Sequence, residues 1–144
     1  MNSERRAFLK DTCKLCASIV GISIVLPAIE GCAPLNYYSA GVSNGKINVP
    51  LASFVEETNM VIVKDKSLNY QVAVIKQKDN SFRAFELKCT HQDNALIATK
   101  SSFVCSLHGS SYDLNGKVTN TPASTNLKEF PIEVINETIQ IQYL

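Results

Sequence analysis

The sequence predicts an all-β domain, because its apolar residues recur at strand spacing and turn residues separate the runs. Met60–Lys64 is a short run rich in β-branched residues, and residues 70–76 alternate around two valines. Residues 82–87 alternate apolar with polar or small side chains. No stretch after residue 46 keeps a helical period over three turns. We therefore expect antiparallel sheets built from short strands.

Later segments continue this pattern. Residues 102–105 predict a further strand, and Asn115-Gly116 is typical of a tight hairpin turn. Residues 130–135 and 138–143 predict a final hairpin whose turn lies at Asn136-Glu137.

Composition limits the classes of function. The chain has 144 residues, enough for one domain with its own core, and 45% apolar with 19% charged residues is ordinary for a globular protein. A formal net charge of +1 provides no basic field, so we expect no nucleic-acid partner. Of the five cysteines, only Cys89 and Cys105 follow residue 32, which excludes a disulfide scaffold.

Residues 1–31 predict an export signal. Arg5, Arg6 and Lys10 make a positive front, and an uncharged apolar stretch follows over 15–29. That stretch is shorter than the roughly 20 residues of a membrane span. Residues 5–10 resemble the twin-arginine export motif, which implies export of an already folded protein. An ordinary secretory signal and an uncleaved membrane anchor remain alternatives.

A cysteine ends this segment. Residues 29–32 resemble a bacterial lipobox, which implies acylation of Cys32 and attachment to a membrane, although Glu30 departs from the usual small or apolar residue. The alternative is a free or buried cysteine. Residues 32–45 hold proline, glycine and serine and predict a linker, so we place the domain at 46–144.

Two cysteine–histidine pairs carry the chemistry. Cys89 and His91 form a Cys-x-His pair, Cys105 and His108 form a Cys-x-x-His pair, and the chain has no other histidine. Thiolate and imidazole together suit zinc or iron. Structural zinc sites usually pair Cys with Cys and His with His across a short turn. A mixed pair on each loop favours a two-iron cluster, with sulfurs on one iron and nitrogens on the other. A structural zinc domain remains the alternative.

Residues 89–113 resemble the Rieske iron–sulfur proteins, whose signature is Cys-x-His, a spacer, and Cys-x-x-His-Gly followed by Ser and Tyr. The resemblance implies the Rieske fold: antiparallel base sheets with an inserted cluster-binding subdomain, here about 88–117. It also implies one [2Fe–2S] cluster per chain. The buried iron would be held by Cys89 and Cys105, and the outer iron by His91 and His108.

The same resemblance implies roles for neighbouring residues. The Ser110 hydroxyl would reach a bridging sulfide and the Tyr112 hydroxyl a cysteine sulfur, and both donors would favour the reduced state. Gly109 would permit a backbone turn or a close approach to the cluster. Pro122 would belong to a loop that covers the cluster.

One departure from the family concerns a cross-link. Respiratory members carry an additional cysteine in each ligand loop, and these two cysteines form a disulfide. Asn94 and Leu107 stand at those positions here, so this bridge cannot form. The departure favours a disulfide-lacking type over ordinary quinol-oxidising subunits.

The functional hypothesis is an electron-transfer protein rather than a stand-alone catalyst. It would be a one-electron carrier, or a small subunit of a membrane-associated or periplasmic oxidoreductase, whose redox partner is a donor enzyme or a cytochrome. The alternative is a subunit of a quinol–cytochrome oxidoreductase whose histidines contact quinol. We expect an exported protein, periplasmic or lipid-anchored at the outer face of a bacterial membrane. A Rieske oxygenase is disfavoured, because its additional mononuclear iron needs two more histidines.

Overall fold

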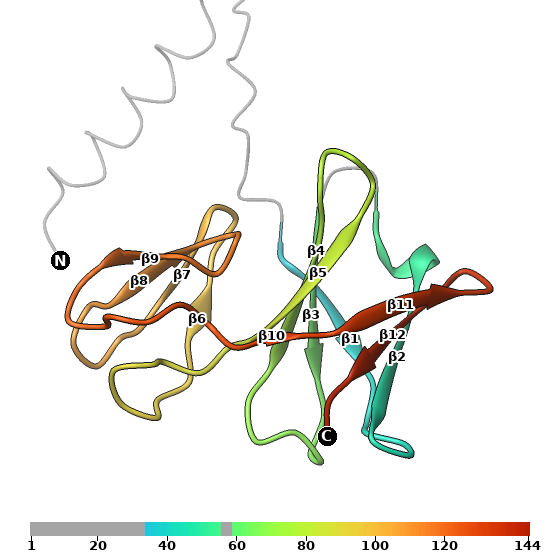
Figure 1. The fold of residues 1–144 in the computed structure, drawn as a ribbon, viewed down its shortest axis with the longest axis horizontal. Helices are drawn as coiled ribbons and strands as arrows, with labels where there is room; N and C mark the ends of the chain where they lie inside the picture. Colours follow the sequence, from blue (N-terminus) through green and yellow to red (C-terminus); the bar gives the residue numbers. More distant parts are fainter. Residues whose placement is uncertain (1–33, 56–58) are drawn as a thin grey trace, which may run out of the picture. The chain divides into compact units, whose positions relative to one another are not determined.

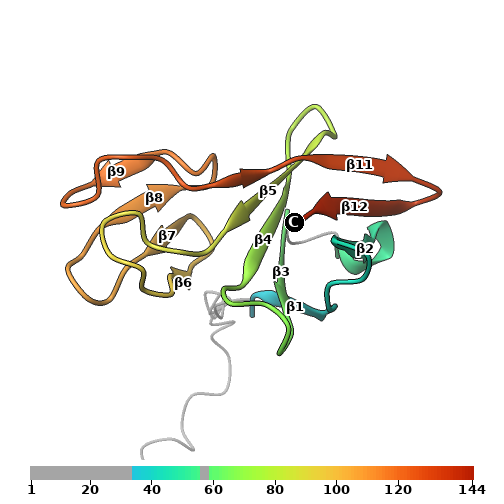
Figure 2. The same ribbon diagram turned by 60° about the horizontal axis from the view of Figure 1, so that its bottom comes forward.

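The computed structural model describes residues 34–55 and 59–144, so the predicted export signal and Cys32 lie outside the described residues. Within those two ranges, no helix has the length and apolar character needed to cross a membrane. Figures 1 and 2 show the strands gathered in three sheets. The elements are β1 (Asn36–Ser39), β2 (Lys46–Pro50), the 3-10 turn η2 (Leu51–Ser53), β3 (Met60–Lys64), β4 (Val72–Lys76), β5 (Phe82–Glu86), β6 (Ile97–Ala98), β7 (Ser102–Val104), β8 (Ser111–Asp113), β9 (Val118–Asn120), β10 (Glu129–Phe130), β11 (Ile132–Ile135) and β12 (Thr138–Gln142).

The central sheet has the order β1-β3-β4-β5-β10, and its strands β3, β4 and β5 pair antiparallel. These are the first three strands that the sequence predicts. Both β3 and β4 bury four successive residues, because both faces of the sheet are covered. Successive side chains point to opposite faces. The sheet therefore has a separate core on each side.

The base sheet has the order β11-β12-β2 and covers one face of the central sheet. Its hairpin turns at Asn136 and Glu137, which both have positive φ (46° and 60°), and this confirms the predicted turn. Between the two sheets lies the base core, which we define as Ile47, Val49, Val61, Val63, Val72, Val74, Ala84, Phe130, Ile139 and Ile141.

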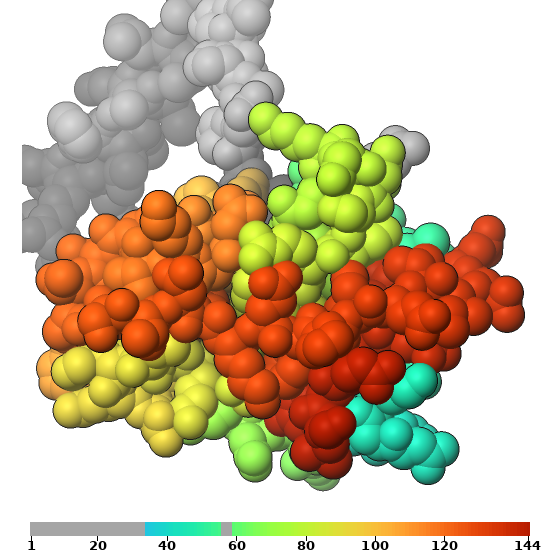
Figure 3. Space-filling model, in the orientation of Figure 1, coloured from blue at the N-terminus to red at the C-terminus, as the bar shows by residue number. Residues whose placement is uncertain are grey.

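The ligand sheet, with the order β6-β7-β8-β9, covers the opposite face. In Figure 3 the yellow and orange chain that contains it forms one end of the described protein. The ligand-side core lies between this sheet and the central sheet, and comprises Met60, Ile62, Ala73, Ile75, Phe85, Leu87, Cys89, Leu96, Phe103, Cys105, Tyr112, Ala123 and Leu127.

The turn between β8 and β9 contains the predicted Asn115-Gly116 pair. The Gly116 N–H donates to the Asp113 carbonyl at 3.0 Å, and Gly116 has a φ of 73°. A Cβ at this position would lie 2.7 Å from the Phe85 ring. Glycine is therefore required twice, by the left-handed backbone and by the close approach of the two sheets.

One expectation about the linker is not met. Within 32–45, Asn36–Ser39 forms β1 and pairs parallel with β3, so the sheet is not purely antiparallel. Tyr38 packs against the base core, while Tyr37 is exposed and the Lys64 ammonium lies 4.9 Å from its ring centroid. The open edge of β3 provides backbone partners for this segment, and such a distant partner overrides a locally turn-rich composition.

Candidate metal centre

The first ligand loop, residues 89–94, follows β5. Leu87 is fully buried and fixes the direction of the chain just before Cys89. The Cys89 N–H donates to the Asn94 carbonyl at 2.8 Å and closes the loop. The Cys89 side chain is 1% exposed, whereas His91 is exposed to solvent. The loop thus directs its thiol inward and its imidazole outward.

The second ligand loop, residues 105–110, connects β7 and β8. The Cys105 N–H donates to the Ser110 carbonyl at 2.8 Å, and the Gly109 N–H donates to the Cys105 carbonyl at 3.0 Å. Gly109 has a φ of 80°, a conformation that glycine adopts without steric cost. Cys105 is 2% exposed, and His108 is exposed. The second loop, like the first, therefore directs its thiol inward and its imidazole outward.

The loops bring the four residues together as two pairs. The ring centroids of His91 and His108 lie 5.1 Å apart with an interplanar angle of 80°. The thiols of Cys89 and Cys105 are both free, and the Cys105 side chain is near enough to help lower the pKa of Cys89. Across 34–55 and 59–144, no three His, Cys, Asp or Glu side chains are grouped around a single metal position. A pair of thiols and a pair of imidazoles fit a two-iron cluster in which sulfur binds one iron and nitrogen binds the other.

The surroundings of Cys89 favour its thiolate. Burial raises the pKa of the Cys89 thiol, but hydrogen bonds with the backbone of Gln92 and His91, the Tyr112 hydroxyl and the Cys105 side chain together outweigh it. The net result is a pKa of about 7. Because thiolate is the form that binds metal, this site is prepared to bind one.

Tyr112 and Thr90 form a hydroxyl network beside this sulfur. The Tyr112 hydroxyl lies 3.7 Å from Cys89 Sγ, accepts the Thr90 N–H at 3.0 Å and lies 2.9 Å from Thr90 Oγ1. The Thr90 hydroxyl donates to the Thr125 carbonyl at 2.6 Å. Burial raises the pKa of Tyr112, so its hydroxyl stays protonated. The Tyr112 hydroxyl is therefore placed to donate to Cys89 Sγ.

Ser110 contacts the segment that follows Pro122. The Ser110 side chain is fully buried, and its oxygen accepts the Ala123 N–H at 3.0 Å. The peptide bond between Thr121 and Pro122 is cis. Ser110 therefore joins the second ligand loop to the proline-containing segment that we expected to cover the site.

Sequence reasoning missed the contacts of Thr90 and Asn94. The Asn94 side-chain amide lies 3.6 Å from Cys105 Sγ, and Thr90 contacts Tyr112 from the other loop. The only signal for Asn94 was its position, where respiratory family members carry the cross-linking cysteine. The signal for Thr90 was its place between Cys89 and His91.

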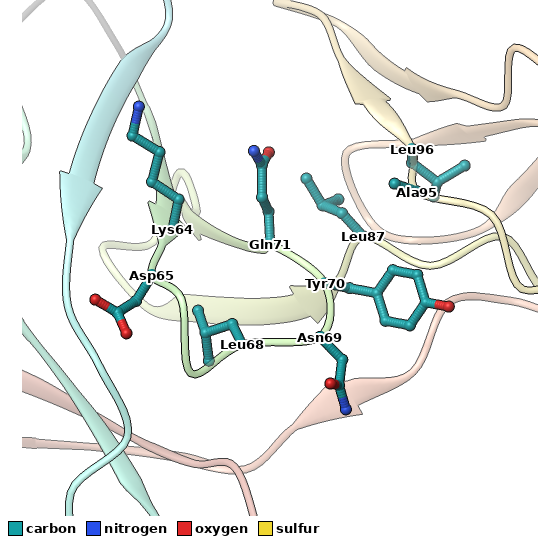
Figure 4. A pocket seen from close by; sticks show the side chains of 9 residues that line it. All are labelled: Lys64, Asp65, Leu68, Asn69, Tyr70, Gln71, Leu87, Ala95 and Leu96. Carbon is teal, nitrogen blue, oxygen red and sulfur yellow. The ribbon is translucent and has the colours of Figure 1, made fainter.

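A pocket of about 320 Å³ lies beside the first ligand loop, between residues 64–71 and Leu87, Ala95 and Leu96 (Figure 4). Its lining contains no thiol or imidazole, so it is not the metal centre. Tyr70, which lines it, donates from its hydroxyl to the Asp93 carbonyl at 2.9 Å. The pocket wall therefore supports the loop that carries Cys89 and His91.

The donor set fits a [2Fe–2S] cluster. Thiolates and neutral imidazoles bind iron, and the two chemical types are separated into a buried pair and an exposed pair. The residues that would hold the cluster are Cys89 and Cys105 on the inner iron, and His91 and His108 on the outer iron.

Comparison with known families agrees with this donor chemistry. The Rieske [2Fe-2S] domain matches residues 39–131, which is more than half of the chain and includes both ligand loops.

Among curated proteins, the biphenyl dioxygenase alpha subunits of Metapseudomonas furukawaii and Paraburkholderia xenovorans (strain LB400) are each 34% identical over 55 residues. The match covers 35% of this chain and 12% of each relative, so the chain spans a small part of their length.

Two solved structures share the fold. Naphthalene 1,2-dioxygenase with indole bound has a TM-score of 0.55 at 24% identity, over 68% of this chain and 26% of that chain. A chain from the complex of reduced oxygenase and oxidized ferredoxin in carbazole 1,9a-dioxygenase has a TM-score of 0.50 at 20% identity, over 69% of this chain and 94% of that chain.

Proposed function

This chain belongs to the Rieske [2Fe–2S] domain family and carries one [2Fe–2S] cluster per domain, and we propose that it is a one-electron carrier or a small electron-transfer subunit of a membrane-associated or periplasmic oxidoreductase. The observation that supports this most is the pairing of two buried thiols with two adjacent, exposed imidazoles.

Each ligand pair has a separate task in this proposal. The cluster, when bound, exchanges one electron at a time. Cys89 and Cys105 would hold it from the buried side, while His91 and His108 would hold the side that a redox partner approaches. Tyr112 and Ser110 would donate hydrogen bonds to sulfur and so favour the reduced form.

Oxygenase activity is not part of the proposal, although the matched relatives are dioxygenase subunits. A mononuclear iron site of that kind uses two histidines and a carboxylate. Both histidines of these 144 residues lie in the ligand pairs. The partner would therefore be another redox protein, a donor enzyme or a cytochrome.

A second candidate is the Rieske subunit of a quinol–cytochrome oxidoreductase. The exposure of both imidazoles supports it, because a quinol could reach them directly. The absence of cysteine at positions 94 and 107 favours the disulfide-lacking, non-respiratory type instead. Electron transfer from a quinol analogue to the purified protein would separate the two candidates.

We further propose export and attachment at the outer face of a bacterial membrane, through acylated Cys32 or an uncleaved N-terminal segment. The support is the sequence alone: the arginine pair Arg5-Arg6 and the lipobox-like residues 29–32. A lipid anchor with two or more chains resists washing with salt. Lys at both arginines should leave the protein in the cytoplasm, and Cys32→Ala should release it from membranes.

Iron and sulfide analysis of freshly purified protein tests the central proposal, together with electron paramagnetic resonance of the reduced form. We expect two irons and two sulfides per chain. Stoichiometric zinc without iron would contradict the proposal and favour the alternative of a structural zinc domain.

A further inference from the structure

Asn94 connects the two ligand loops. Its carbonyl accepts the Cys89 N–H at 2.8 Å and so closes the first loop. Its side-chain nitrogen Nδ2 lies 3.6 Å from Cys105 Sγ, in the second loop. The same nitrogen lies 3.2 Å from the Ala95 carbonyl oxygen. One residue therefore ends one loop and contacts the metal-binding sulfur of the other.

We propose that Asn94 is a positioning residue of the cluster site, whose side-chain amide donates a hydrogen bond to Cys105 Sγ, joins the two loops and favours the reduced form. The inference rests on the proposed role of Cys105 as a ligand of the inner iron. It adds a residue to the site that motif reasoning assigns no function.

The direction of the effect follows from charge. A ligand sulfur becomes more negative when an electron is added, and an N–H donor stabilises negative sulfur more strongly than neutral sulfur. Cys105 is 2% exposed, so water competes little for this contact. Loss of the amide should therefore lower the midpoint potential.

Each of the two sulfurs has a side-chain donor from outside its own loop. Cys89 is contacted by backbone groups of its own loop and by Tyr112. The Asn94 amide reaches Cys105 from the opposite loop. Its hydrogen bond consequently depends on how the two loops are held together, and it reports on their separation.

The contact also explains how the loops cohere without a disulfide. Leu107, at the second position where respiratory members have a cysteine, is 52% exposed and is not turned into the site. The link from position 94 instead runs to Cys105. It is non-covalent, so it should depend on the amide group and be indifferent to thiol reductants.

A purely structural role makes a different prediction. Asparagine is favoured in turns, and the Ala95 contact alone could explain its presence. A turn residue would change the melting temperature and leave the midpoint potential unchanged. A donor to sulfur would change the potential and the iron–sulfur vibrations of the oxidised protein.

The test compares three variants of the full chain. Asn94→Leu removes the donor at similar size, and Asn94→Asp keeps the shape but replaces the donor with a carboxylate. Asn48→Leu is the matched control, since it removes an exposed amide from β2, outside both ligand loops. Film voltammetry gives the midpoint, where a tenfold loss of preference for the reduced form equals about 59 mV for one electron. Resonance Raman spectra give the iron–sulfur stretching frequencies.

We expect both Asn94 variants to shift the midpoint negatively, Asn94→Asp by more, and Asn48→Leu to leave it unchanged. A cluster-loaded Asn94→Leu protein with the wild-type midpoint and Raman bands overturns the inference and leaves the proposed function intact. If Asn94→Leu loses its cluster, Asn94→Asp decides by the same measurements, and an unshifted midpoint there overturns the inference. Wild-type protein without a [2Fe–2S] cluster overturns the proposed function and this inference with it.

Discussion

The central sheet has a core on each face, and the two cores bury different kinds of side chain. The base core is wholly apolar, with eight of its ten residues valine or isoleucine. The ligand-side core uses the alternate residues of the same strands, yet it includes two thiols and the phenol of Tyr112. Apolar burial is non-directional and scales with area, whereas thiols and hydroxyls depend on individual hydrogen bonds.

This difference separates stability from redox tuning. Because successive residues of β3, β4 and β5 belong to different cores, a substitution in one core removes no side chain from the other. Substitutions in the base core should change the free energy of unfolding without changing the midpoint potential. Polar substitutions around the ligand loops should change the potential at a smaller cost in stability.

The largest expected effect is on the base side. Ile139 is fully buried in the base core, and Ile139→Ala should lower the free energy of unfolding by about 2–5 kcal/mol through lost transfer energy and a cavity. Ile139→Val should cost about 0.5–1.5 kcal/mol. Urea denaturation followed by circular dichroism measures both. A shift of the midpoint potential in the folded Ile139→Val protein would break the separation of the two cores.

Ser110→Ala should have the next largest effect, on both the free energy of unfolding and the midpoint potential. It leaves the buried Ala123 N–H without its acceptor, which costs about 1–3 kcal/mol. It also removes a hydroxyl donor that we assign to cluster sulfide, so the midpoint should fall. Ser111→Ala is the control, because Ser111 is only partly buried and its hydroxyl contacts the Gly109 carbonyl at 3.3 Å. Equal effects of the two substitutions on the midpoint would contradict the role of Ser110.

Tyr112→Phe should lower the midpoint with a stability loss of about 0.5–1.5 kcal/mol for each hydrogen bond removed. Tyr143→Phe provides a matched control in the other core, since Tyr143 packs against Phe130 at a ring-centroid distance of 5.2 Å. Voltammetry should show a shift for Tyr112→Phe alone. A similar shift for Tyr143→Phe would mean that the potential responds to general loosening.

Thr90→Val should act in the opposite direction. The Thr90 hydroxyl donates to the Thr125 carbonyl, so it can only accept from Tyr112. It thereby competes with Cys89 Sγ for the single phenolic proton. Valine removes the competitor, and the midpoint should rise, with little change in stability because Thr90 is exposed. Thr90→Ser, which keeps the hydroxyl, should retain the wild-type midpoint.

The sequence predicts the parts of this comparison that are local. The alternation around β4 and β5, the Asn136-Glu137 turn and the cysteine–histidine spacing each lie within a short stretch, and the structure has the expected strands and turns there. The four proposed ligands follow from residue type and spacing, and the loops bring them together as two pairs.

The remaining features depend on contacts between distant segments. The strand β1 forms because the edge of β3 is open to it, and residues 36–39 alone do not specify that partner. The amide of Asn94 and the hydroxyl of Thr90 gain their roles only when the two loops meet. Which alternate residues face the ligand sheet likewise depends on the register of the central sheet.

The smallest expected effect concerns an ion pair on the strand that returns from the ligand sheet. Arg83 on β5 donates to both carboxylate oxygens of Glu129 on β10, at 2.8 and 2.6 Å. The Arg83 hydrogen bond lowers the pKa of Glu129 below its ordinary value of 4.5. The two side chains are 33% and 45% exposed, so the pair should contribute only about 0.2–1 kcal/mol.

The sign of its pH dependence follows from that lowered pKa. The folded state binds the Glu129 proton more weakly than the unfolded state, so the stabilisation is fully present above about pH 4.5 and is lost as the pH falls through the lower folded value. The difference in unfolding free energy between wild type and Glu129→Gln should therefore shrink in acid. Glu133→Gln, at an exposed position of β11, is the control. Because neither Arg83 nor Glu129 forms a hydrogen bond or ion pair with a ligand loop, the midpoint should stay constant. Any shift would mean that β10 also positions the ligand loops.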